Sequence, residues 1–314
     1  MKPKKRLKFA ITFLIFIVII VNTMAVFHAY KFTHFVEEKQ NSSSTVSNKL
    51  NILDKVKTIL FGINNSKPKY SGPIPEGYHS KTLVSNVDLN IWENNIPNSK
   101  GIILLFHGYS AEKSSLMENA KFFNDLGYST ILTDFMGHGA SEGQQTTIGY
   151  FEAENVKTVY DYAKTKNDTI LLYGFSMGSV AVMKAVADLK LKPNKIILEC
   201  PFGSMQKTVE KRFENMNIPS FPMANLLTFW GGTINGFWAF DHNPEDYAKS
   251  ITQPTLLMYG KKDKNVTLQE IETIFGNLNS SIKEKYLFEK AGHENYLINY
   301  SKTWKETVAQ FISQ

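Results

Sequence analysis

Two stretches of the sequence place a serine between two glycines, with the Gly-x-Ser-x-Gly spacing of a nucleophilic serine on a sharp turn. They are "GFSMG", around Ser176, and "GASEG", around Ser141. A serine hydroxyl attacks a carbonyl carbon efficiently only when a neighbouring base takes its proton and a third group orients that base. The sequence around each serine decides which of the two is the better candidate.

Ser176 lies between a predicted strand and a predicted helix. The apolar run "TILLYG" precedes it, and the amphipathic run "MGSVAVMKAVADL" follows it directly. Strand, tight turn and helix form the setting of a nucleophile elbow, where glycines prevent collisions between the turn and its neighbours. Ser141 lies in "MGHGASEGQQTT", where no helical pattern begins before about residue 151. We predict that Ser176 is the nucleophile.

The base should lie downstream of Ser176, because in this arrangement the nucleophile is followed along the chain first by the acid and then by the histidine. Only His242 and His293 follow Ser176. His293 comes just after the predicted strand "EKYLFEKA", where a loop at the sheet edge would bring it over the elbow. His242 lies in a long insertion and fits a turn or the start of a helix. We predict that His293 is the base.

The predicted acid is Asp263, three residues after the predicted strand "TLLMYG". Its position at the end of a strand, between the serine and the histidine in chain order, fits the third member of a triad. An exposed turn aspartate between lysines is the competing interpretation of this residue. Asp241 and Asp246 are the alternative acids.

Two backbone N–H groups are candidates for stabilising a negatively charged oxygen. Met177 follows the nucleophile at a helix N-terminus, where the helix dipole favours negative charge. Tyr109 lies in the loop after the predicted strand "GIILLFHG" and offers the second N–H group. His107, at the tip of the same strand, is predicted to be a structural loop residue.

The elements that position these residues alternate between short β-rich runs and amphipathic helical runs. "KTLVS" and "VDLNIWE" predict an opening hairpin around Asn86, and the all-apolar "GIILLFHG" predicts a strand buried on both faces. Helices are expected near residues 114–126, 151–164, 179–189 and 267–276, and from about residue 302. Alternating strands and helices predict a mostly parallel sheet covered on both faces.

The N-terminus predicts a membrane anchor. Five basic residues lie within residues 2–8, and no formal charge follows from Phe9 to Tyr30. At about 1.5 Å per residue this run can cross a hydrocarbon core of about 30 Å. The basic flank favours a cytoplasmic N-terminus with the rest of the chain outside. A cleaved signal peptide, and hence a secreted protein, is the alternative, with a small-x-small site at residues 23–25.

Charge and cysteine content exclude several classes of function. The net charge is +6, but the basic residues before the span account for most of it, so nothing indicates nucleic-acid binding. The single cysteine, Cys200, cannot form an intramolecular disulfide and is predicted to be a small buried residue. No pair of histidines or cysteines has metal-ligand spacing, so no metal is expected.

Five stretches in this order, "LLFHGYS", "TDFMGHGASEG", "YGFSMGS", "YGKKDKNV" and "KAGHENY", resemble the α/β-hydrolase superfamily. The resemblance is to its monoglyceride-lipase-like and serine-aminopeptidase-like branch, and it covers roughly residues 100–296. It implies the α/β-hydrolase fold and the roles given above for the triad and the two backbone donors, and it carries no cofactor. Met136 stands where such proteins usually have an arginine.

The chain is predicted to have three parts. Residues 1–30 are the anchor or signal sequence, and residues 31–75 are a juxtamembrane tether with a short amphipathic helix at 52–63. Residues 76–314 are the α/β-hydrolase domain, with a lid insertion at about 203–250. The lid is rich in aromatic residues, which either form an acyl-binding wall or pack the lid on the domain. The tentative substrate-binding residues among them are Phe229, Trp230, Phe237 and Trp238.

The predicted function is a membrane-anchored serine hydrolase that cleaves carboxylic esters through an acyl-enzyme. The anchor and the aromatic lid suggest a lipidic substrate. A serine aminopeptidase or a thioesterase with the same machinery is the first alternative, and a non-catalytic binding protein is the second. An acidic pocket group that pairs with a free amine would favour the peptidase; the candidates are Glu199, Glu210, Glu214 and Asp241.

Overall fold

A computed structural model describes residues 3–37, 57, 58 and 60–314. Its centre is an eight-stranded sheet in the order β10-β9-β8-β7-β5-β6-β4-β3. β3 pairs antiparallel with β4 and β4 antiparallel with β6, whereas all other neighbours are parallel. The strands are β3 His79–Val84, β4 Asp88–Asn94, β5 Ile102–Phe106, β6 Ser129–Thr133, β7 Ile170–Phe175, β8 Lys195–Glu199, β9 Thr255–Gly260 and β10 Lys283–Phe288.

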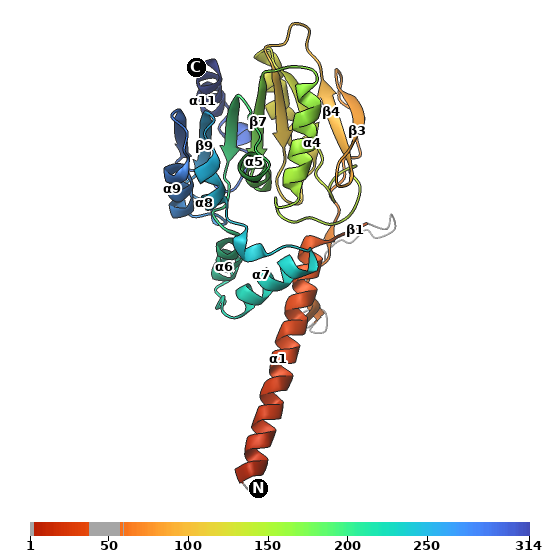
Figure 1. Cartoon of the computed structure of the whole chain (residues 1–314), viewed down its shortest axis with the longest axis vertical. Helices are drawn as coiled ribbons and strands as arrows, with labels where there is room; N and C mark the ends of the chain where they lie inside the picture. The colour runs from red at the N-terminus through yellow and green to blue at the C-terminus, as the bar shows by residue number, and fades with distance from the viewer. Residues whose placement is uncertain (1–2, 38–56, 59) are drawn as a thin grey trace.

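Helices cover the sheet and extend from one end of it (Figure 1). Both the mostly parallel sheet and the preceding β3–β4 hairpin agree with the sequence-based prediction, and the predicted fold class is confirmed. The helices are α1 Pro3–Thr33, α3 Met117–Asp125, α4 Glu152–Lys164, α5 Met177–Asp188, α6 Met205–Asn215, α7 Met223–Ile234, α8 Pro244–Tyr247, α9 Leu268–Asn277, α10 Tyr296–Asn299 and α11 Ser301–Ser313.

The core lies in two layers because successive residues of a buried strand point to opposite faces. In β5, Leu104 and Phe106 belong to the layer that also contains the buried residues of α4 and α5. Ile103 and Leu105 belong to the opposite layer, which contains those of α3 and α11. All five residues of β5 are buried, as expected for a central strand covered on both faces.

One predicted helix start differs from the structure by two residues, and one short helix was not predicted. α5 begins at Met177, directly after Ser176, and not at residue 179. The helix can begin this early because Gly178, in its first turn, has no side chain that would collide with β5. α10 has only four residues, too few for a helical pattern to be recognised in the sequence. Half of the helix predicted at 52–63 lies outside the described residues, and residues 57, 58, 60 and 61 are helical.

The first helix, α1, is the one helix in the described part of the chain that is long and apolar enough to cross a membrane. Residues 4–20 are exposed along its projecting part, whereas Ala25, Ala29 and Thr33 are buried. This buried part packs against α7, and β1 (Phe35–Val36) pairs with β2 (Asn65–Ser66). The first residues of the predicted tether, 31–36, are therefore packed, because the helix continues to Thr33 and its end contacts the domain.

The close contact between α5 and β5 allows a stability test. A Cβ at Gly178 would lie 2.2 Å from the Phe106 carbonyl oxygen, whereas a Cβ at Gly276, in α9, meets nothing within 4 Å. We expect Gly178→Ala to lower the free energy of unfolding by about 3 kcal/mol, because backbone must move to admit the methyl group. Gly276→Ala, the matched control, should leave stability unchanged or raise it by up to about 1 kcal/mol. Denaturant unfolding of the detergent-solubilised chain measures both, and equal effects would contradict the assigned contact.

Candidate active site

Ser176 occupies a strained backbone conformation between β7 and α5. Its φ is +51° and its ψ is −114°, in a region that residues with a side chain rarely adopt. The Ser176 N–H donates to the Glu199 carbonyl oxygen at 2.8 Å. The Ser179 hydroxyl donates to the Gly174 carbonyl oxygen at 2.6 Å, which fixes the turn from inside. A Cβ at Gly174 would lie 2.5 Å from the Ser179 nitrogen, so this position also requires glycine.

Asp263 lies in the turn after β9. Its Oδ1 accepts hydrogen bonds from the N–H groups of Asn265, at 2.7 Å, and Val266, at 3.0 Å. These bonds orient the carboxylate and leave Oδ2 facing His293. The Asp263 side chain is fully buried, so its charge is held in a fixed position.

His293 joins the other two residues. Its Nδ1 lies 2.7 Å from Asp263 Oδ2, and its Nε2 lies 2.8 Å from Ser176 Oγ. The loop that carries His293 packs closely on the end of β9, because a Cβ at Gly260 would lie 2.5 Å from the carbonyl oxygens of Ala291 and Gly292. The structure thus brings together, within hydrogen-bonding distance, the three side chains that the sequence predicts as a triad.

The surroundings of His293 shift its pKa upward. Burial lowers this pKa, but the Asp263 carboxylate bonded to Nδ1 raises it. The carboxylate stabilises the imidazolium, the form that His293 takes after accepting a proton. The arrangement therefore favours proton transfer from the serine hydroxyl to the imidazole.

The other serine and histidines that the sequence singled out have structural partners. The Ser141 hydroxyl is buried, donates to the Asp134 carbonyl oxygen at 2.7 Å and accepts from the Asn90 N–H at 2.8 Å. His242 lies between the Tyr247 hydroxyl, at 3.0 Å, and the Ile148 carbonyl oxygen, at 3.1 Å. Burial lowers its pKa to about 4, so this imidazole is neutral near pH 7.

His107 is likewise structural. Its Nε2 accepts from the Phe135 N–H at 3.2 Å, and its Nδ1 lies 2.8 Å from the Gly108 carbonyl oxygen. Burial lowers its pKa to about 4. It fixes the backbone of the loop after β5, in agreement with the prediction that it is no base.

The two predicted backbone donors lie on segments that flank Ser176. Met177 is the first residue of α5, so its N–H has no acceptor within the helix. The loop that carries Tyr109 runs beside the nucleophile, because a Cβ on the preceding Gly108 would lie 3.5 Å from the Ser176 Cβ. Burial raises the pKa of the Tyr109 phenol to about 12, which keeps that hydroxyl neutral.

The four lid aromatics divide into two groups. Phe237 stacks on Tyr150 of the main domain with ring centres 4.2 Å apart, so it packs the lid on the domain. The Trp230 Nε1–H donates to Asn22 Oδ1 of α1 at 3.2 Å. Phe229 contacts both Trp230 and Trp238 edge to face, at 5.1 and 6.0 Å, and Trp238 is half exposed. Of the two predicted roles of the lid aromatics, packing of the lid on the rest of the chain therefore applies directly to Phe237 and Trp230.

The positions of two residues near the site were not predicted from the sequence. Cys200 directly follows β8, and its sulfur lies within 4.8 Å of ligand atoms of Asp263 and His293. Burial raises the pKa of this thiol, so it is uncharged near neutral pH. Its position at the end of a central strand is a signal that the sequence does contain. The three residues form a group that could ligate a metal, although Asp263 and His293 already bond to each other.

Arg212 is the second missed residue. It lies on α6 of the lid, and its guanidinium carbon is 4.1 Å from the ring centre of Phe32, at the end of α1. Among the described residues, no carboxylate forms an ion pair with it. Its charge also acts on the phenol of Tyr109. The sequence around Arg212 gave no signal that its side chain would contact Phe32.

Comparison with known proteins agrees with this architecture. Residues 97–230 match the family model described as "Serine aminopeptidase, S33". An esterase of Pyrococcus furiosus, Pf2001, superposes with a TM-score of 0.66 at 20% identity, over 79% of this chain and 96% of the esterase. The chain thus resembles α/β hydrolases, in its fold and in the sequence of residues 97–230. The matched residues include Tyr109, Ser176 and Met177, whereas Asp263 and His293 lie beyond them.

Two sequence relatives of this chain bear on its function. An uncharacterized protein of Bacillus subtilis, YqkD, is 25% identical over 67% of this chain and 70% of its own length. Lysophosphatidylserine lipase ABHD12 of Xenopus tropicalis is 22% identical over 81% of this chain and 64% of its own length. The alignments thus span about two thirds of each relative. The predicted enzyme class, a serine hydrolase, is confirmed.

The contact between Asp263 and His293 predicts a measurable shift. We expect Asp263→Asn to lower the pKa of the His293 imidazole, because a neutral amide no longer stabilises the imidazolium. Histidine-selective NMR over a pH series measures this pKa, with the His293 signal assigned by its loss in His293→Gln. Asp246→Asn, at an exposed carboxylate in the lid insertion that pairs with Lys249, is the control and should leave the titration unchanged. An unaltered His293 pKa in Asp263→Asn would contradict the assigned contact.

Proposed function

We propose that this chain is a membrane-anchored serine hydrolase that cleaves carboxylic esters with a lipidic acyl group. The observation that carries the proposal is the placement of His293, whose two ring nitrogens face Ser176 Oγ and Asp263 Oδ2. This arrangement supplies a nucleophile, a base and a group that orients the base. The names of the lipase and esterase relatives support an ester substrate.

The proposed reaction has two halves. His293 accepts the Ser176 proton as the serine oxygen attacks the ester carbonyl, and the backbone N–H groups of Met177 and Tyr109 stabilise the resulting oxyanion. The imidazolium gives its proton to the departing alcohol, which leaves an acyl-serine. Water then attacks the acyl group, and His293 again takes and returns the proton, so the acid is released and the serine is restored. The Asp263 carboxylate remains ionised throughout.

The geometry of α1 and the lid supports a lipidic substrate. Crossing about 30 Å of hydrocarbon takes about 20 residues, so a span that starts at Phe9 reaches beyond Asn22 and Ala25. These two residues face the lid: Ala25 is buried, and Asn22 binds Trp230 of α7. The part of the lid that packs on these residues would therefore reach into the bilayer. Large apolar side chains that the lid leaves exposed are Met216, Ile218, Phe221 and Trp238.

The aminopeptidase alternative requires an acidic group that binds a free amine, and three of the four predicted acids have other partners. Glu199 is buried and accepts from the Trp304 indole N–H at 2.5 Å. Glu210 accepts from the Gln206 amide, and Glu214 pairs with Lys211. The charge that does lie next to Tyr109 is the cation of Arg212, which repels an ammonium group. This arrangement favours an ester over a peptide N-terminus.

The two serines in the same sequence pattern provide a matched test. We expect Ser176→Ala to abolish labelling by a fluorophosphonate probe and to lower kcat for p-nitrophenyl esters by about 10⁴-fold or more. Ser141→Ala should keep both labelling and turnover, because that hydroxyl only bridges two backbone groups. Both variants are measured as full chains in detergent. Loss of labelling in Ser141→Ala but not in Ser176→Ala would exchange the two roles and reject the proposed mechanism.

The substrate class is decided with a panel given to the wild-type enzyme. Carboxylic esters of rising chain length should be cleaved with kcat/KM that rises with acyl length, because the lid is rich in apolar surface. Aminoacyl anilides and acyl thioesters are the competing substrates. Preference for an anilide with a free amine would move the function to an aminopeptidase, and preference for a thioester would move it to a thioesterase.

Membrane orientation is a separate expectation. The basic residues before α1 favour a cytoplasmic N-terminus, which places the hydrolase domain on the other side of the membrane. An alkaline phosphatase fused after Gln314 should then be active, whereas green fluorescent protein at the same position should not fluoresce. The reverse pair of results would place the domain in the cytoplasm. Release of the alkaline phosphatase fusion into the medium would indicate a cleaved signal sequence.

A further inference from the structure

We propose that the end of α1 is a positioning element of the active site, and that Phe32 holds the two segments that carry the oxyanion donors. This inference rests on the proposed function, in which Tyr109 and Met177 are those donors. It gives the membrane helix a part in catalysis beyond attachment. Residues 32–35 are called the α1 end below.

The first support is the fixation of Tyr109. Its hydroxyl donates to the Phe32 carbonyl oxygen at 2.8 Å and accepts from the Asn65 side-chain amide at 3.3 Å. Its ring stacks on the Phe32 ring, with centres 4.7 Å apart and planes 19° apart. It also contacts Phe35, which is 1% exposed, at 5.6 Å. Most of the contacts that orient the Tyr109 side chain thus come from the α1 end.

The second support is the loop of residues 144–149, which connects the α1 end to Met177. The Phe35 N–H donates to the Gln144 carbonyl oxygen at 2.8 Å, and the Thr146 N–H donates to the Thr33 carbonyl oxygen at 2.8 Å. The Thr146 hydroxyl lies 3.6 Å from the Met177 sulfur. A displacement of the α1 end would therefore reach both donor segments.

The loop at residues 144–149 is itself held firmly. The buried Glu152 carboxylate accepts the Thr146 hydroxyl at 2.6 Å, the Thr147 N–H at 2.9 Å and the Gly149 N–H at 2.9 Å. Hydrogen bonds to a buried charge are stronger than those between neutral groups. The loop is therefore rigid, so a displacement of Thr33 would move it as a unit.

The lid completes the contact on the other side of Phe32. The Arg212 guanidinium lies 4.1 Å from the Phe32 ring centre, so this ring is placed between the loop after β5 and the lid. Nearer the membrane, the buried faces of both helices consist of small residues at a spacing of four, which allows a close approach. They are Ala25, Ala29 and Thr33 on α1 and Ala224, Thr228 and Gly232 on α7.

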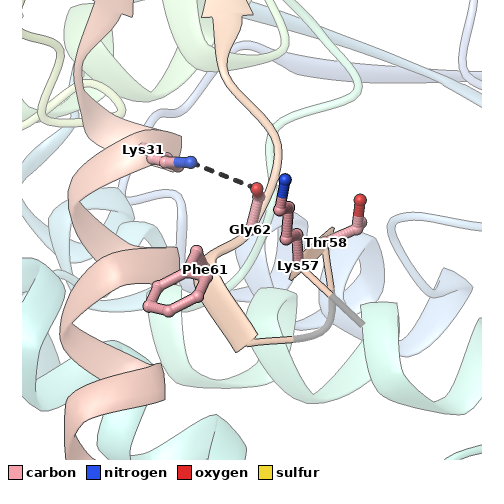
Figure 2. A pocket seen from close by; sticks show the side chains of 5 residues that line it. All are labelled: Lys31, Lys57, Thr58, Phe61 and Gly62. Atoms are coloured by element: carbon pink, nitrogen blue, oxygen red, sulfur yellow. Dashed lines mark hydrogen bonds between the residues drawn. The ribbon is translucent and has the colours of Figure 1, made fainter. Parts of the chain in front are cut away.

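A further face of α1 is covered by residues 57, 58 and 60–62 (Figure 2). The Lys31 ammonium donates to the Gly62 carbonyl oxygen at 3.3 Å, and the Phe61 ring meets Phe27 edge to face at 5.2 Å. The hollow lined there by Lys31, Lys57, Thr58, Phe61 and Gly62 includes no residue of the triad. The helix is thus packed on several sides, and the α1 end has a fixed position relative to the triad.

The chemistry predicts which kinetic constant the α1 end controls. Oxyanion donors act on the charge that develops in the transition state, and removing one such donor entirely costs about 10²–10³-fold in kcat. A misplaced donor retains part of its effect. Changes at the α1 end should therefore lower kcat by about 10-fold and leave KM nearly unchanged.

The test compares variants of the full chain in detergent micelles. Phe32→Ala removes the ring between Tyr109 and Arg212, and Tyr109→Phe removes one hydroxyl while keeping the ring and the backbone N–H. Phe13→Ala is the matched control, because it makes the same change on the same helix at a side chain that is 55% exposed. The measurements are kcat and KM for a short p-nitrophenyl ester and the affinity for a trifluoromethyl ketone, which forms an oxyanion with the active serine.

The inference expects kcat and ketone affinity to fall together, by about 10-fold, in Phe32→Ala and Tyr109→Phe, with Phe13→Ala unchanged. Thermal unfolding shows whether each variant is folded, and Tyr109→Phe decides the matter if Phe32→Ala is not. Wild-type kcat in the folded variants, or a loss confined to KM, overturns the inference. Turnover that persists in Ser176→Ala instead rejects the proposed function, so the two failures are distinguishable.

Discussion

The contact between the first turn of α5 and the carboxyl end of β5 determines where the candidate site can form. Gly178 brings the helix against the Phe106 carbonyl group, and no larger residue fits there. The turn before it is strained at Ser176, and a strained residue of this kind costs about 1–3 kcal/mol. The hydrogen bonds from Ser176 to Glu199 and from Ser179 to Gly174 offset that cost. The serine is therefore held ready at the start of a helix, where anionic charge is favoured.

The strand order explains which side chains meet above this turn. β7, β8, β9 and β10 are consecutive neighbours in the sheet, and Ser176, Cys200, Asp263 and His293 follow them in the same order. The serine and the aspartate lie two strands apart, so the imidazole that joins them must pass over the end of β8. Cys200 occupies that end, which is why its sulfur lies against the triad although the proposed reaction does not use it.

Much of this arrangement could be predicted from the sequence because its signals are local. An apolar strand before Ser176 and a helical pattern after it identify the elbow, and Asp263 and His293 each follow a strand that the sequence also marks. The partners of α1 could not be predicted in the same way, because a helix that is apolar on every side has no face that its sequence marks for contact with protein. Its small residues at 25, 29 and 33 were the available signal, and only the folded chain shows that α7 packs on them. The same limit applies to Phe32 and Arg212, whose contact joins remote segments.

The packing of α7 on α1 also bears on the order in which the protein is made. The bond between Asn22 and Trp230 joins residues 208 positions apart, so the helix is synthesised long before its partner. Under the proposed membrane anchoring, α1 would already lie in the bilayer when α7 is synthesised and packs on it. Contacts this distant in sequence form slowly, because the intervening chain must first be ordered. A proposed membrane span would then hold the packing face of α1 in place before α7 reaches it.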